Sequence, residues 1–221
     1  MLLLALDAAL ARCSAAVVVD GQVAAERAEP GGRGHGAVLA PLVAAVLAEA
    51  GHAATALDAV AVTVGPGSFT GLRSAIALAQ GIALAAGCPV VGVTTAEAMV
   101  AALPELPGWT LWVAIDSRRG RIFLDRGGSI RSVALDALPA ADGPIAVAGD
   151  AAIEVAARLA ARNDKVMLTE ARLPLARHLA RVAERRLRGE LPPLPAQPLY
   201  IDPPEARLPA GGLRPPPQPH A

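Results

Sequence analysis

The chain has 221 residues, and its 20 basic and 20 acidic side chains give a formal net charge of zero. A neutral chain has no overall attraction to nucleic acid, so any contact with RNA has to be local or come through a partner. The lack of an uninterrupted apolar run of about 18 residues argues against a membrane span. Cys13 and Cys88 are far apart and outside any C-x-x-C pattern, which fits a reducing cytoplasm without a disulfide framework or a zinc site. The N-terminus has no basic segment and Asp7 interrupts its apolar run, so we expect no signal peptide.

The first half of the chain predicts a lobe that is rich in strands. Hydrophobic residues make up 53% of the chain and aromatic residues 2%, so alanine, valine and leucine must fill the core. Asp20 and Gly21 mark a hairpin turn, and Gly51 and Gly87 each end a helix. We expect strands over residues 2–6, 13–19, 22–28, 59–64 and 90–93, and helices over residues 37–50 and 74–86.

The second half repeats this pattern in a reduced form. Strands are expected over residues 111–115, 121–125 and 145–148, and helices over residues 151–162 and 175–188. The order of elements resembles the RNase H-like half of the actin, Hsp70 and sugar-kinase fold. We therefore predict an α/β protein with two such lobes, the second degenerate. Pro104 and Pro107 place the boundary between residues 1–104 and 105–205, and the proline-rich residues 206–221 are expected to form a flexible tail.

A glycine-rich turn, GPGSFTGLR, spans residues 65–73 between a predicted strand and a predicted helix. Such a turn presents backbone N–H groups that suit an anion or a nucleotide phosphate. It is not a P-loop, because no Lys-Ser/Thr pair follows the glycines. The residues alone favour the alternative that the glycines only satisfy a tight backbone geometry. The candidate anion or nucleotide site consists of Asp7, Gly65, Pro66, Gly67, Ser68, Phe69, Thr70, Gly71 and Arg73.

This turn resembles the signature of the TsaB family, also called YeaZ. Members of that family are non-catalytic subunits of the bacterial complex that makes threonylcarbamoyladenosine in tRNA. Further segments resemble the family in the same order along the chain, up to about residue 206. They are residues 3–7 with 13–17, 33–35, 88–95, 115–123 and 198–200. The resemblance implies a two-lobed actin-like fold and pairing with the catalytic paralogue TsaD.

The two predicted helices of the first half are apolar all round. Residues 37–50 carry no charge before Glu49, and Gln80 is the one strongly polar residue inside residues 74–86. A helix on a sheet normally has a polar outer stripe, so either another part of this chain or a partner has to cover these helices. We predict a dimerisation surface, which the resemblance assigns to TsaD. Its predicted residues are His35, Val38, Leu39, Leu42, Val46, Leu72, Ala75, Ile76, Ala79 and Ala83.

The sequence argues against catalysis by this chain alone. Asp7 is followed by residues 8–10 (AAL), which offer no hydroxyl or glycine to hold a phosphate, so we interpret Asp7 as a turn former. The resemblance places Thr95 and Met99 where TsaD has its metal-binding His-x-x-x-His motif, and neither side chain replaces an imidazole. Residues 149–151 (GDA) are only a weak trace of an adenosine pocket. We therefore predict no catalytic residue, metal or cofactor in this chain, with ATP and metal on partner subunits.

The last predicted helix carries a row of arginines at helical spacing. They are Arg177, Arg181, Arg185 and Arg188. The simpler interpretation is the solvated face of an amphipathic helix. The alternative is a patch that holds tRNA phosphates once a complex has assembled.

These features predict a non-catalytic scaffold and activating subunit of the tRNA threonylcarbamoyladenosine complex. Its predicted partners are a TsaD-like catalytic subunit and a TsaE-like ATPase, with tRNA bound only through the complex and no membrane contact. One alternative is an independent ATP-dependent phosphotransferase of the sugar-kinase type. Another is a homodimeric binding protein. The sequence does not separate homodimer from heterodimer, because both need the same apolar helix faces.

Overall fold

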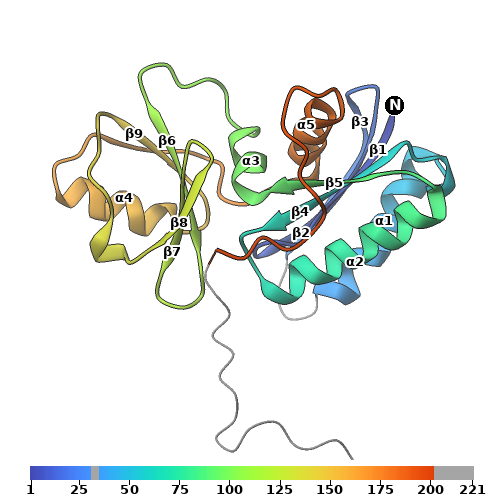
Figure 1. The fold of residues 1–221 in the computed structure, drawn as a ribbon, viewed down its shortest axis with the longest axis horizontal. Helices are drawn as coiled ribbons and strands as arrows, with labels where there is room; N and C mark the ends of the chain where they lie inside the picture. Colours follow the sequence, from blue (N-terminus) through green and yellow to red (C-terminus); the bar gives the residue numbers. More distant parts are fainter. Residues whose placement is uncertain (31–34, 202–221) are drawn as a thin grey trace, which may run out of the picture.

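Two five-stranded sheets lie side by side and form two lobes (Figure 1). The computed structural model describes residues 1–30 and 35–201. Sheet A has the strand order β3-β2-β1-β4-β5. Its strands are β1 (Leu2–Asp7), β2 (Arg12–Val19), β3 (Gln22–Pro30), β4 (Ala59–Gly65) and β5 (Val90–Thr94). Strands β1 and β4 are parallel and buried on both faces, which explains their uninterrupted apolar sequences.

Sheet B repeats the arrangement of sheet A. Its strands are β6 (Thr110–Asp116), β7 (Ile122–Arg126), β8 (Ser129–Val133), β9 (Ile145–Ala148) and β10 (Val166–Leu168). The order is β8-β7-β6-β9-β10, with β6 central as β1 is in sheet A. In both sheets the first three strands form an antiparallel meander, and the last two run parallel to the central strand. The predicted pair of related lobes is confirmed.

Helices cover both faces of sheet A. Helices α1 (His35–Ala50) and α2 (Phe69–Ala86) pack side by side on one face, and α5 (Ala176–Leu187) packs on the other. Because α5 follows the strands of sheet B in the sequence, the lobe built on sheet A contains residues from both ends of the described chain. Helix α3 (Thr95–Val100) contacts both α5 and β6, and α4 (Ala152–Ala161) packs on sheet B.

The helix ends follow local capping rules. Helix α2 begins at Phe69 rather than at the predicted residue 74, because the Ser68 side chain accepts a hydrogen bond from the N–H of Gly71 at 3.2 Å. It ends at Gly87, which has a φ of 69° in the left-handed region. Helix α3 begins with a capping box between Thr94 and Glu97.

One described helix, α2, is long and apolar enough to cross a membrane by length and composition alone. This differs from the sequence expectation, because the helix starts earlier and its 18 residues contain one charge, Arg73. Six of its residues are buried against the rest of the protein, and a core helix passes the same test. The predicted tail, residues 206–221, and the segment 31–34 lie outside the described residues.

Candidate functional site

The glycine-rich turn lies between β4 and α2 and packs against the β1–β2 turn. An ideal Cβ atom on Gly67 would lie 2.3 Å from the carbonyl oxygen of Ala9, and one on Gly71 would lie 2.1 Å from that of Ala8. Backbone atoms cannot move aside as a flexible side chain can, so both positions require glycine. These two glycines allow the turns that follow β1 and β4 to touch.

The N–H groups of this turn are largely bonded within the chain. Ser68 donates its N–H to the carbonyl of Ala9 at 2.7 Å, and Leu72 donates to the carbonyl of Ser68 at 2.9 Å. The N–H of Gly71 is bonded to the Ser68 side chain. Gly65 and Pro66 are buried, whereas Phe69, Thr70 and Arg73 are exposed. Binding of an anion by the turn remains a prediction, and these internal hydrogen bonds favour a structural role for its glycines.

Asp7 is fully buried beneath the turns that follow β1 and β4. Its Oδ1 atom accepts hydrogen bonds from the Thr63 hydroxyl at 2.6 Å and from the N–H of Ala9 at 3.2 Å. Its Oδ2 atom is buried and has no hydrogen-bond partner among the described residues. Burial raises the pKa of the Asp7 carboxyl from 3.8 to about 6, although the two hydrogen bonds oppose the rise. A carboxyl that water does not reach is poorly placed to hold a solvated metal or a phosphate.

The positions that resemble the TsaD metal motif are also inside the protein. Thr95 and Met99 are both fully buried. The Thr95 hydroxyl donates a hydrogen bond to the carbonyl of Pro66 at 2.7 Å, which ties α3 to the glycine-rich turn. The Thr95 hydroxyl is already hydrogen-bonded and the Met99 thioether lies in the core, so neither side chain fits a ligand of a catalytic metal. In residues 1–30 and 35–201, no three His, Cys, Asp or Glu side chains gather as metal ligands.

The end of the described chain forms a strap across β4, β5 and α2. Leu199 donates its N–H to the carbonyl of Val64 at 2.8 Å, and the Gln80 side chain donates to the carbonyl of Ala196 at 3.1 Å. The strap places Tyr200 beside Arg73, whose guanidinium also lies 3.4 Å from the centre of the Phe69 ring. Tyr200 lies in the segment 198–200 that resembles the TsaB family, but it is not among the predicted site residues.

The structure corrects the residues predicted for the dimerisation surface. Eight of them lie in the protein's own core: Leu39, Leu42, Val46, Leu72, Ala75, Ile76, Ala79 and Ala83. Val38 is half-buried against the same core, and the side chain of His35 lies outside the described residues. On a helix that is apolar all round, the stripe that packs on the sheet is fixed by the packing of the whole lobe, so these residues cannot also form the outer surface.

The outer surface of α1 and α2 consists mainly of small apolar residues, together with the larger Leu84 and the polar Gln80. We call it the α1–α2 face, and its exposed residues are Ala37, Ala40, Pro41, Ala44, Ala48, Ala77, Gly81, Leu84 and Ala85. Leu84 is 85% exposed. The exposed charges described on these two helices are Glu49 and Arg73, which lie near helix ends. A charge-free surface of two adjacent helices is unusual in contact with water.

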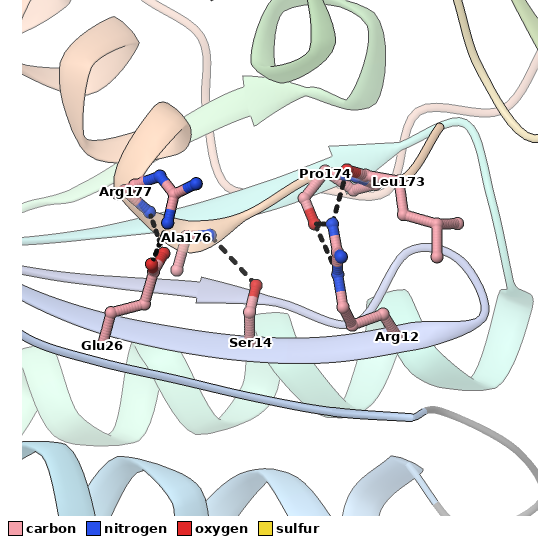
Figure 2. Close-up of polar contacts among 7 residues, drawn as sticks. All are labelled: Arg12, Ser14, Glu26, Leu173, Pro174, Ala176 and Arg177. Carbon is pink, nitrogen blue, oxygen red and sulfur yellow. Dashed lines mark hydrogen bonds and ion pairs between the residues drawn. The ribbon is translucent and has the colours of Figure 1, made fainter. Parts of the chain in front are cut away.

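Helix α5 is held at its N-terminus by side chains from sheet A (Figure 2). The N–H of Ala176 donates to the Ser14 hydroxyl at 3.0 Å, and the N–H of Arg177 donates to the Glu26 carboxylate at 3.1 Å. Arg12 donates to the carbonyl of Leu173 at 2.6 Å. These contacts satisfy helix-terminal N–H groups and place a negative charge at the positive end of the helix dipole.

Most of the predicted basic face of α5 is used in local ion pairs. Arg177 pairs with Glu26, and Arg185 and Arg188 share Glu190. Such pairs reduce the charge that is free to attract RNA, which favours the simpler interpretation of a solvated helix face.

In the second lobe, Asp150 receives a hydrogen bond from the N–H of Asp116 at 2.9 Å and an ion pair from Arg118 at 3.2 Å. Burial raises the pKa of Asp150. An ideal Cβ on Gly149 would lie 1.9 Å from the carbonyl oxygen of Ala114, so this glycine serves close packing of the backbone. Residues 149–151, which the sequence suggested as a weak trace of an adenosine pocket, therefore form a tightly packed turn.

Comparisons with known proteins identify the family. The model of the TsaD family, described as tRNA N6-adenosine threonylcarbamoyltransferase, matches residues 18–178. The solved structure of YeaZ from Pseudomonas aeruginosa is 29% identical, with a TM-score of 0.70, over 90% of this chain and 99% of that one. The TsaB protein of Escherichia coli is 40% identical over 124 residues, which are 56% of this chain and 53% of that protein. The chain belongs to the TsaB (YeaZ) family.

Two uncharacterized proteins are also similar to this chain. The crystal structure of an uncharacterized protein from Pseudomonas aeruginosa, described as similar to the peptidase YeaZ, has a TM-score of 0.77 and 29% identity over 91% of this chain and 99% of that chain. An uncharacterized protein of Mycobacterium tuberculosis is 40% identical over 153 residues, or 66% of this chain and 71% of that protein. The chain spans about half the length of the Escherichia coli TsaB that it matches. The actin-like fold expected from the sequence is confirmed.

Proposed function

We propose that this chain is a non-catalytic scaffold and activating subunit of a complex that makes threonylcarbamoyladenosine in tRNA. It would pair with a TsaD-like catalytic subunit, and the pair would work with a TsaE-like ATPase in the cytoplasm. Membership of the TsaB family supports this role, because the TsaB relative from Escherichia coli is named for biosynthesis of this modified nucleoside.

The observation that carries the proposal is the α1–α2 face. Its exposed alanines and Gly81 let a partner helix approach the backbone closely, and the face lacks charges that association would have to strip of water. Leu84, which is 85% exposed, provides a projecting apolar side chain. Two helices from each subunit would form a four-helix contact. Burying this face removes apolar surface from water, which is the dominant favourable term in most protein association.

The buried groups support a non-catalytic role. Asp7 has no access to a bound phosphate, and Thr95 and Met99 do not fit a metal. ATP and metal therefore belong to the partner subunits. The TsaD-like subunit would transfer the threonylcarbamoyl group from threonylcarbamoyl-AMP to the adenosine beside the anticodon. This chain would act by binding the active form of that subunit more tightly than other forms, which raises its population.

A reconstituted reaction tests this division of labour. TsaD-like and TsaE-like proteins from the same source are incubated with tRNA, threonylcarbamoyl-AMP and ATP, and modified adenosine is measured by mass spectrometry of the digested tRNA. We expect activity to require this chain, to survive Asp7→Asn and to be lost with Ala77→Arg on the α1–α2 face. Ala157→Arg, at an exposed position of α4, is the matched control and should remain active.

Two results would refute the proposal. Full activity without this chain would remove the activating role. Nucleotide turnover by the isolated chain that Asp7→Asn abolishes would instead favour the independent phosphotransferase.

A further inference from the structure

Three exposed side chains meet at the start of helix α2: Phe69, Arg73 and Tyr200. We call them the Arg73 cluster. The sequence has two Phe, two Trp and one Tyr residue. Phe69 and Tyr200 are 63% and 57% exposed, whereas the other Phe and both Trp residues are buried or half-buried. An arginine between exposed aromatic rings is a combination that is enriched where proteins bind one another.

The chain holds Arg73 in place before any partner binds. Its guanidinium stacks on Phe69, one helical turn earlier, and donates a hydrogen bond to the Tyr200 hydroxyl. The strap crosses sheet A to the start of α2 (Figure 1), where the N–H of Leu199 is bonded to the carbonyl of Val64. This backbone bond fixes Tyr200, the next residue. A side chain that is already ordered loses little conformational entropy on binding, so Arg73 is suited to be an anchor.

The Arg73 cluster continues the α1–α2 face. The exposed residues of α2 follow one another at intervals of three or four, so they lie along one side of the helix. They are Phe69, Arg73, Ala77, Gly81 and Leu84. The last three belong to the α1–α2 face, and therefore a partner that covers this face along α2 reaches the Arg73 cluster at one end.

That end of the face carries an unbalanced positive charge. The charges described on α1 and α2 are Glu49 and Arg73. Glu49 is neutralised within the chain by an ion pair with Arg27 at 3.0 Å. The contacts of Arg73 within residues 1–30 and 35–201 are with aromatic residues, and no ion pair with a carboxylate is among them. Covering a guanidinium without a carboxylate strips it of water at a cost, so the protein that covers this end is expected to bring a negative charge.

A second copy of this chain meets that requirement poorly. The carboxylate that it offers on α1 and α2 is Glu49, which would have to leave Arg27 in order to pair with Arg73. The apolar part of the face contributes affinity without selecting the partner, whereas a charge that lacks its counter-charge disfavours a wrong partner.

We propose that Arg73 selects the partner of the α1–α2 face, and that this partner is a helix of a different protein that brings an Asp or Glu side chain against the guanidinium. The inference rests on the proposed pairing with a TsaD-like subunit and adds the residue that favours this pairing over self-association. Arg73 contacts the partner, and Tyr200 is a positioning residue that acts through Arg73.

The test compares two affinities of the full chain. Isothermal titration calorimetry measures binding to the TsaD-like protein from the same source, and sedimentation equilibrium measures self-association. Arg73→Met, which keeps a long side chain and removes the charge, should weaken the complex about tenfold, and Arg73→Glu should weaken it further. Arg158→Glu, at an exposed position of α4, is the matched control and should bind like the wild type. Neither Arg73→Met nor Glu49→Gln should weaken self-association. Circular dichroism checks that each variant is folded.

Two double substitutions identify the contact. Exposed Asp and Glu residues of the TsaD-like protein are replaced one at a time by lysine, and one of these variants should bind Arg73→Glu more tightly than it binds the wild-type chain. Tyr200→Phe should weaken the complex in the wild-type chain and have no further effect together with Arg73→Met, because it acts through that arginine.

The outcomes separate this inference from the proposed function. Wild-type affinity in both Arg73 variants, or rescue of Arg73→Glu by none of the lysine variants, would overturn the inference and leave the proposed pairing intact. Absence of a complex with the wild-type chain would overturn both. Self-association that Arg73→Met and Glu49→Gln both weaken would overturn the inference in favour of a second copy as the partner.

Discussion

Replacement of Asp7 by asparagine should remove a pH-dependent loss of stability. In the folded protein burial raises the pKa of Asp7 to about 6, whereas its ordinary value is 3.8. The folded state therefore binds the proton more tightly than the unfolded state. The favourable contribution of the protonated group is fully present below about pH 4 and is lost as the pH rises toward 6. The difference between the two pKa values corresponds to about 3 kcal/mol of unfolding free energy.

The assay is urea unfolding of the wild-type chain and Asp7→Asn at several pH values between 4 and 7.5. Other titrating groups contribute equally to both proteins, so the difference between the two unfolding free energies isolates Asp7. We expect this difference to change by about 2–3 kcal/mol between pH 4 and pH 7 in favour of the asparagine variant. Glu105→Gln, which changes an exposed carboxylate, is the control and should give a nearly constant difference. A constant difference for Asp7→Asn would show that water reaches this carboxyl. It would refute the conclusion that burial raises the pKa of Asp7.

Two further substitutions test the packing of the first lobe. Gly71→Ala should lower the unfolding free energy by about 2 kcal/mol in urea unfolding, because its Cβ meets the carbonyl of Ala8. Gly81→Ala, in open space on the same helix, should raise the unfolding free energy by about 1 kcal/mol. A lower unfolding free energy for both variants would contradict a specific backbone contact at Gly71. Glu26→Gln should cost about 1 kcal/mol by weakening the anchor of α5, while Glu29→Gln at an exposed position of the same strand should be neutral. Equal stability of these two glutamine variants would count against that anchor.

The fold of the first lobe could be predicted from the sequence because four of its strands are largely apolar runs and the turn at Asp20 and Gly21 marks the fifth, β3. The main difference is the start of α2, which the Ser68 cap moves forward to Phe69. In the second lobe, β8 and β10 were not predicted. Both lie at sheet edges, and β10 has only three residues, so their conformation depends on pairing with β7 and β9 rather than on a local pattern.

The candidate site could be predicted only in part from the sequence. The glycine-rich turn was found, but the contacts that require its glycines come from Ala8 and Ala9, which are distant in the sequence. The outer face of α1 and α2 could not be chosen from periodicity, because both faces of each helix are apolar. In α1, side-chain size was an available signal, because the core selected leucines and valines and left alanines such as Ala44 outside. In α2 size gave no signal, because Ala75 is buried while Leu84 is exposed.

The central claim is that the α1–α2 face binds a TsaD-like subunit. Size-exclusion chromatography with light scattering measures this directly, on the chain alone and mixed with the TsaD-like protein from the same source. We expect a one-to-one complex with the wild-type chain and with Ala157→Arg, and no complex with Ala77→Arg, while circular dichroism shows all three chains folded. A homodimer that persists in the mixture, or a complex that Ala77→Arg leaves intact, would contradict the account.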